Sequence, residues 1–295
     1  MTNSTIRPFL LATAFALAGC GGGSDNVVSI PPPPVTPMPT PTPTPTSTYA
    51  IIPQAISTQE FAVAGASHSA AEDRMTQVGA GGQLQVRYVQ SSNSYEVRVP
   101  QSTAWAGISY MSTPSNSLID FGGDSAILWI RTDPSVGGGY SYSSLFEWAD
   151  TKSTIEGHEA IGMATPASGV PISGSATYSG QILGQSNEPH GDDYPVEGTI
   201  ALSFNFAAGS LSGSITPNLH QGFVSDPLAF RDTVYSTGST SFSGKFDTSL
   251  AGLNSFSGLF TGPSAQELIG NFAFPYRSPI DDAVYQADGA FVGAR

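Results

Sequence analysis

Hydrophobic and polar residues alternate in the second half of the chain. Over residues 200–206 every second position is Ile, Leu or Phe, and the positions between them carry Ala, Ser or Asn. Successive side chains of a β-strand point to opposite faces, so this pattern predicts a strand with one buried face. Similar runs recur to the C-terminus. They predict eight strands, near 174–183, 195–206, 209–217, 228–236, 239–247, 255–262, 266–275 and 284–293.

A short unit of an aromatic residue and a glycine two positions later repeats among these strands. It occurs as Tyr178-Ser179-Gly180, Phe242-Ser243-Gly244, Phe256-Ser257-Gly258 and, with valine between, Phe291-Val292-Gly293. Large and small residues thus share one strand face, an alternation that fills the inside of a narrow closed barrel. Glycine also permits the strong bend of such strands.

The sequence therefore predicts an all-β fold with an eight-stranded antiparallel β-barrel over residues 172–295. The alternative is an integral outer-membrane barrel, whose apolar residues would face lipid. Glycines on the aromatic face disfavour that alternative. We expect a water-soluble barrel with five phenylalanines inside: Phe204, Phe256, Phe260, Phe272 and Phe291.

The region before the barrel is less regular but β-rich, and we expect it to form a handle-like β domain. Apolar runs predict strands over 84–89, 95–99, 126–131 and 140–148, separated by turn-forming Gly, Ser, Pro and Asn. A short helix is predicted over 66–75, with Ser67 as its N-cap. Residues 165–171 are rich in Thr, Pro and Gly and indicate a break before the barrel.

The N-terminus has the layout of a secretory signal. An apolar segment, 8–17, follows Arg7 and is too short to span a bilayer. Leu17-Ala18-Gly19-Cys20 resembles a bacterial lipobox, which predicts cleavage before Cys20 and lipidation of its sulfur. The alternative is an ordinary signal peptide with a chance cysteine. Acylation would anchor the protein to a lipid bilayer, and Gly21, in place of a retaining aspartate, favours the outer membrane.

A Thr-Pro repeat follows the lipobox, over residues 31–47. Proline favours extended polyproline II, so at about 3.1 Å per residue this spacer would reach roughly 50 Å from the membrane. The predicted organisation is a signal peptide over 1–19, a lipidated linker over 20–48, a handle-like domain over 49–164 and a barrel domain over 165–295.

Composition limits the partners and the chemistry of the mature chain. Removing Arg7 with the signal changes the formal charge from −13 to −14, which disfavours nucleic acid and favours basic partner surfaces. Cys20 is the single cysteine, so its lipidation would leave no thiol for disulfides, metal binding or nucleophilic catalysis.

Three separated motifs of the barrel region resemble transferrin-binding protein B and its relatives. The strongest covers 256–272 and includes Gly262-Pro263-Ser264-Ala265-Gln266-Glu267; the others are the first strand, 174–180, and the last, 289–295. The resemblance implies a bacterial surface lipoprotein whose lobe pairs an eight-stranded barrel with a handle β domain. The chain has room for one lobe. Known partners of the family include transferrin, haemoglobin and a complement regulator.

Candidate chemical residues are few, and each has a structural interpretation. Glu267 follows a Gly-Pro turn, which suggests a local capping or pairing role rather than a ligand contact. We expect Trp105, Trp129 and Trp148 to lie in the core. The four histidines are too scattered to predict a metal site: His68, His158, His190 and His220. Of these, His190 lies in a polar loop that could take part in iron or haem chemistry, although a solvated turn is the simpler interpretation.

These observations predict a non-enzymatic, membrane-anchored binding protein for an iron carrier or a haem-related solute. No catalytic motif, cofactor site or metal site is predicted, and the ligand-binding residues stay open. The alternatives are a structural or adhesive envelope lipoprotein without a solute ligand and, ranked below both, an envelope hydrolase.

Overall fold

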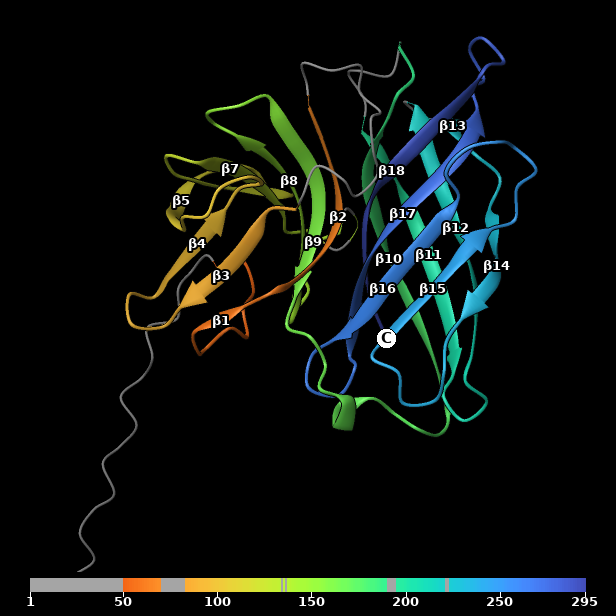
Figure 1. Ribbon diagram of the computed structural model, residues 1–295, viewed down its shortest axis with the longest axis horizontal. Helices are drawn as coiled ribbons and strands as arrows, with labels where there is room; N and C mark the ends of the chain where they lie inside the picture. Colours follow the sequence, from red (N-terminus) through yellow and green to blue (C-terminus); the bar gives the residue numbers. More distant parts are fainter. Residues whose placement is uncertain (1–49, 70–82, 134, 136, 190–194, 221–222) are drawn as a thin grey trace, which may run out of the picture. The chain divides into compact units, whose positions relative to one another are not determined.

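The computed structural model describes residues 50–69, 83–133, 135, 137–189, 195–220 and 223–295. The described residues all belong to one compact unit, 47–295. They form two antiparallel β-sheets (Figure 1). The predicted all-β class is confirmed. Within the described residues, no helix is long and apolar enough to cross a membrane.

The first sheet, which we call the handle sheet, has nine strands in the order β1-β3-β4-β5-β6-β7-β8-β9-β2. Its two edge strands are consecutive in sequence and separated only by Phe61, so the sheet curls almost into a second barrel. The strands are β1 (Gln59–Glu60), β2 (Ala62–Ser69), β3 (Gln85–Val89), β4 (Ser94–Arg98), β5 (Ala106–Ser115), β6 (Leu118–Gly122), β7 (Ala126–Arg131), β8 (Ser143–Asp150) and β9 (Ile155–Gly162).

The second sheet closes into the predicted eight-stranded barrel, because β11 pairs with both β10 and β12. A two-residue strand, β13 (Phe223–Val224), extends one edge beside β12. The eight barrel strands are β10 (Ser175–Ser186), β11 (Val196–Asn205), β12 (Ser210–His220), β14 (Leu228–Val234), β15 (Ser241–Phe246), β16 (Ser255–Thr261), β17 (Glu267–Arg277) and β18 (Val284–Ala294).

Aromatic side chains fill the barrel interior. All five predicted phenylalanines belong to one core cluster and are at most 2% exposed. The glycines between them leave the space that the rings occupy. A Cβ atom at Gly270 would lie 2.0 Å from Cζ of Phe291, and one at Gly258 would lie 2.5 Å from Cζ of Phe242. The repeated aromatic–glycine unit is therefore a packing requirement of this narrow barrel.

The predicted helix over 66–75 is wrong where the structure describes it. Residues 66–69 continue β2, where Ala66 pairs with His158 of β9, and residues 70–75 lie outside the described part. Alanines at alternate positions gave this strand a helical composition. Packing favours the strand over the helix, because Ala62 and Ala64 fit closely against the barrel.

Four further handle strands, β1, β5, β6 and β9, were not predicted from the sequence. Strand β5 is exposed at almost every position from residue 109 onward, so it has no alternation of polar and apolar residues. Strand β9 is buried over its second half, 159–162, and begins that half with a glutamate, so polar and apolar residues do not alternate there. The linker between the sheets contains a 3₁₀ turn, η2 (Ala167–Gly169), where residues 165–171 predicted a break.

Candidate functional site

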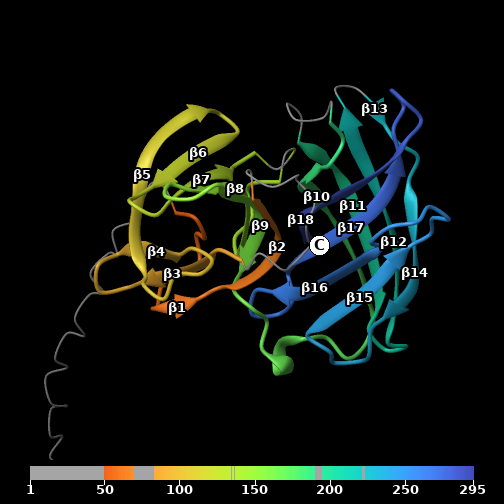
Figure 2. The ribbon, with the colours of Figure 1, turned by 45° about the horizontal axis from the view of Figure 1, so that its top comes forward.

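The handle sheet packs against the outside of the barrel along a buried seam (Figures 1 and 2). Side chains from β2, β8 and β9 meet side chains from β10, β17 and β18. Strands β17 and β18 are consequently buried on both faces over most of their length. The apolar seam consists of Ala64, Leu145, Ala160, Leu183, Ile269, Ala290 and Val292.

Glu267 fastens one end of this seam. It begins β17 of the barrel, is 5% exposed, and accepts hydrogen bonds from two backbone N–H groups of the handle segment, Ser141 at 2.8 Å and Tyr142 at 3.0 Å. Beside it, the hydroxyls of Ser143 and Thr261 share a hydrogen bond of 2.6 Å. The contact joins residues more than a hundred positions apart, so the predicted local role of Glu267 is wrong.

Polar and charged side chains join the two sheets farther along the seam. His68 of β2 lies 3.0 Å from Asp288 of β18, and both side chains are almost fully buried. Arg131 of β7 contacts Glu147 of the same sheet at 2.6 Å and Glu197 of the barrel at 3.3 Å. These pairs fix the lateral position of the handle sheet on the barrel.

Burial shifts the pKa values of several groups in the seam. It is the main cause that lowers the pKa of His158 to about 3, and the neighbouring His68 contributes to the same shift. Burial raises the pKa of Glu267, while the N–H donors of Ser141 and Tyr142 oppose that rise. Burial and the charge of Glu267 raise the pKa of Tyr140 to about 12. Shifted groups often mark active sites, but these are engaged in holding the sheets together.

The outer surface of the handle sheet carries an aromatic and basic cluster, the handle patch: Arg87 of β3, Arg98 of β4 and Trp105. The guanidinium groups of Arg87 and Arg98 lie 4.4 Å and 4.7 Å from the centroid of the Trp105 ring. Arg87 also donates to Glu96 at 2.7 Å. The arginines hold the half-buried indole in a fixed orientation at the surface.

The β5–β6 hairpin, 106–122, begins directly after Trp105 and carries exposed apolar side chains. Tyr110 is 41% and Met111 57% exposed. The Tyr110 ring packs edge-on against Phe121 with 6.3 Å between centroids, which holds it in place. No residue between 99 and 119 is charged, although the chain as a whole is strongly acidic. Trp, Arg, Tyr and Met are the residue types enriched at protein–protein interfaces.

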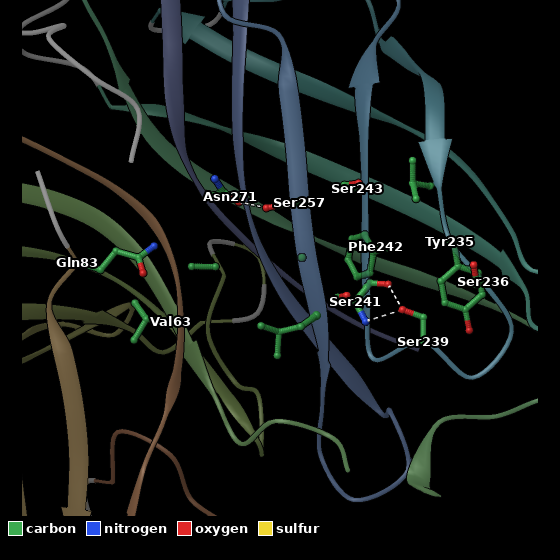
Figure 3. Close-up of a pocket in the computed structure, with 14 residues that line it drawn as sticks. Val63, Gln83, Tyr235, Ser236, Ser239, Ser241, Phe242, Ser243, Ser257 and Asn271 are labelled. Carbon is green, nitrogen blue, oxygen red and sulfur yellow. Dashed lines mark hydrogen bonds between the residues drawn. The ribbon is translucent and has the colours of Figure 1, made fainter. Parts of the chain in front are cut away.

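A groove of about 540 Å³ lies between the handle sheet and the outer face of β15, β16 and β17 (Figure 3). We call it the serine groove. Ser243, Ser257 and Asn271 form a row across the three strands, because Ser243 pairs with Ser257 and Ser257 with Asn271. Val63 and Gln83 of the handle form the opposite side. A second groove, of about 670 Å³, involves Tyr140 and Glu267 and lies against β10, β11 and β12.

The structure separates the residues that the sequence singled out. Cys20 and His190 lie outside the described residues, and only the backbone of His220 is described. His68 and His158 lie in the seam, and no group of three potential metal ligands occurs among the described residues. The predicted core position is confirmed for Trp148, which is 1% exposed. It is wrong for Trp105 and Trp129, which are half-buried: Trp105 lies in the connection before β5, and Trp129 stands on an outward-facing position of β7.

The serine groove and the hairpin were not identified from the sequence. Serines at alternate positions of β15 and β16 predict only an outward-facing side of the barrel. That Gln83 lies opposite them depends on how the two sheets pack. The hairpin had one usable signal, the long uncharged stretch over 99–119 in an acidic chain.

The fold is a single lobe in which an aromatic-filled barrel packs against a curled handle sheet. Residues 170–295 match the family model described as the C-lobe and N-lobe beta barrels of Tf-binding protein B. The barrel region of this chain thus matches the model of the transferrin-binding protein B barrels, and the resemblance predicted from the three motifs is confirmed.

Solved structures of transferrin-binding protein B are similar to the chain at low identity. The protein from Haemophilus parasuis Hp5 is 15% identical over 72% of this chain and 50% of that one, with a TM-score of 0.43. The isotype 1 protein from serogroup B Neisseria meningitidis is 15% identical over 79% and 43%, also with a TM-score of 0.43. The chain spans half or less of the length of these two proteins. No curated protein sequence matches it.

Proposed function

We propose that the protein is a bacterial surface lipoprotein that binds a protein iron carrier, or a haem-related solute, without catalysing a reaction. The observation that carries this proposal is the handle patch and the neighbouring hairpin on a barrel of the transferrin-binding protein B family. Trp105, Tyr110 and Met111 offer apolar contact area, and the arginines at Trp105 offer hydrogen-bond donors.

Charge supports a protein partner that is basic overall. The mature chain would carry −14, so a basic carrier is attracted over the distance of a Debye length, about 8 Å at physiological salt. The stretch 99–119 carries no charge of its own. Close contact at Trp105, Tyr110 and Met111 would bury apolar rather than acidic side chains, which lowers the cost of burying this surface.

The proposed anchor is the acylated Cys20, which would hold the protein on the outer leaflet of the outer membrane. The Thr-Pro segment, 31–47, would act as a spacer of roughly 50 Å. A long spacer lets the handle patch reach a large partner above the membrane surface. Surface exposure is therefore part of the proposal.

The test is binding of the purified chain to iron-loaded transferrin, haemoglobin and haemin by surface plasmon resonance. We expect one of these to bind, and Trp105→Ala or Met111→Ser to weaken that affinity at least about tenfold, since hot-spot residues contribute 1.4 kcal/mol or more. Leu253→Ser is the matched control, because Leu253 is an equally exposed apolar residue, 52% accessible, on the barrel.

Expression under iron limitation gives an independent measurement. A receptor should be induced, and its deletion should slow growth on a bound-iron source. Unchanged growth together with no binding to the three probes would leave the structural or adhesive lipoprotein as the better interpretation.

A further inference from the structure

We propose that the serine groove is a second binding site, for a neutral oligosaccharide. The site is separate from the handle patch and uses different strands. Its first supporting feature is the row of Ser243, Ser257 and Asn271 across β15, β16 and β17. Neighbouring strands lie about 4.8 Å apart, so the row places three polar groups at regular intervals along the groove.

The hydrogen bonding of this row leaves donors available to a ligand. The hydroxyl of Ser257 donates to Oδ1 of Asn271 at 2.6 Å, which fixes the amide and directs its nitrogen away from that bond (Figure 3). Serine hydroxyls and the Asn and Gln amides both donate and accept hydrogen bonds. Sugar hydroxyls do the same, so such a wall can match them without any charged group. Gln83 supplies a second amide from the handle side.

The lining residues also indicate that the ligand is uncharged and has some apolar surface. All the described residues that line the groove are uncharged, in a chain with a net charge of −13. An ionic ligand would lose hydration there without gaining a counter-charge. Val63, Ala64 and Leu259 add apolar surface suited to the C–H faces of sugar rings. The volume of about 540 Å³ lies within the usual range for small-ligand sites, roughly 300–1,000 Å³.

The test is isothermal titration calorimetry on the full-length chain in detergent. The neutral probes are cellohexaose, maltoheptaose and chitohexaose, and the anionic probe is sialyllactose. We expect at least one neutral probe to bind. Ser257→Trp, which places a large side chain across the groove, should weaken binding at least about tenfold. Asn271→Leu removes the fixed amide and keeps a similar side-chain volume. It should weaken binding by a comparable factor, because the sugar hydroxyls that the amide binds would lose their hydrogen-bond partner.

Ser212→Trp is the matched control. Ser212 is an exposed outward serine of β12, on a strand that does not line the serine groove, and its replacement should leave the affinity unchanged. Unaltered far-ultraviolet circular dichroism would show that each variant is folded. The proposal is overturned if no neutral probe binds, if only sialyllactose binds, or if Ser257→Trp and Ser212→Trp have equal effects. None of these results depends on binding of an iron carrier at the handle patch.

Discussion

Glu267→Ala should detach one end of the handle sheet from the barrel and lower the stability of the whole lobe. The wild-type carboxylate is 5% exposed and accepts from the N–H groups of Ser141 and Tyr142. Hydrogen bonds to a charged acceptor contribute about 1.5–3 kcal/mol each, and leaving buried N–H groups unpaired costs a similar amount.

The expected loss in the free energy of unfolding is smaller than the sum of two such hydrogen bonds. Two bonds would give about 3–6 kcal/mol if the N–H groups stayed dry. Glu267 also lines the second groove, so water can replace part of the lost bonding after truncation. Removing the carboxylate also removes the cost of burying it, the effect that raises its pKa. We therefore expect a decrease of about 2–3 kcal/mol in the free energy of unfolding.

Urea unfolding of the compact unit 47–295 measures this decrease, with two optical probes. Trp105, Trp129 and Trp148 all lie in the handle region, so their fluorescence reports on that sheet, while circular dichroism reports on both sheets. Glu60→Ala, at an exposed position of β1, is the control and should change stability by less than about 0.5 kcal/mol. Equal small losses for Glu267→Ala and Glu60→Ala would refute the proposed role of this carboxylate.

Three further changes test the core, the seam and the anchor. Phe260→Ala should cost about 3–5 kcal/mol in urea unfolding, because Phe260 is fully buried among other rings; a loss below 1 kcal/mol would contradict that packing. The wild-type protein should lose stability relative to a His158→Gln variant as the pH drops below about 6.5, where the unfolded chain protonates His158 but the folded chain, with a pKa of about 3, does not. This difference changes by at most about 1.4 kcal/mol per pH unit, or roughly 1.6 kcal/mol between pH 6.5 and 5. Cys20→Ser should release the protein from the membrane fraction or leave it uncleaved, and a mature N-terminus found elsewhere by mass spectrometry would exclude the lipobox.

The barrel could be predicted from the sequence because each strand has one filled interior face and one outer face. The alternation at 200–206 and the aromatic–glycine units are direct records of that geometry. The sequence of the handle sheet has no comparable alternation of large and small or apolar and polar residues. β2 presents alanines to the barrel, and most of β5 is exposed on both faces. Strands whose environment is set by another sheet, or by none, have no period-two pattern to detect.

The same reasoning explains why the sharpest sequence motif was a poor guide to a ligand. The segment 262–267 lies where barrel strands β16 and β17 meet the handle, so its residues satisfy the barrel turn and the seam at once. Because this short segment must form the barrel turn and also pack against the handle, its sequence is distinctive even without a ligand. The sequence of a surface that binds a partner is constrained by that partner alone. In this chain such surfaces consist of ordinary serines, an uncharged hairpin and a tryptophan held between strands by arginines, and their grouping depends on the packing of the two sheets. The place to look for function in this lobe is therefore away from its most recognisable motif.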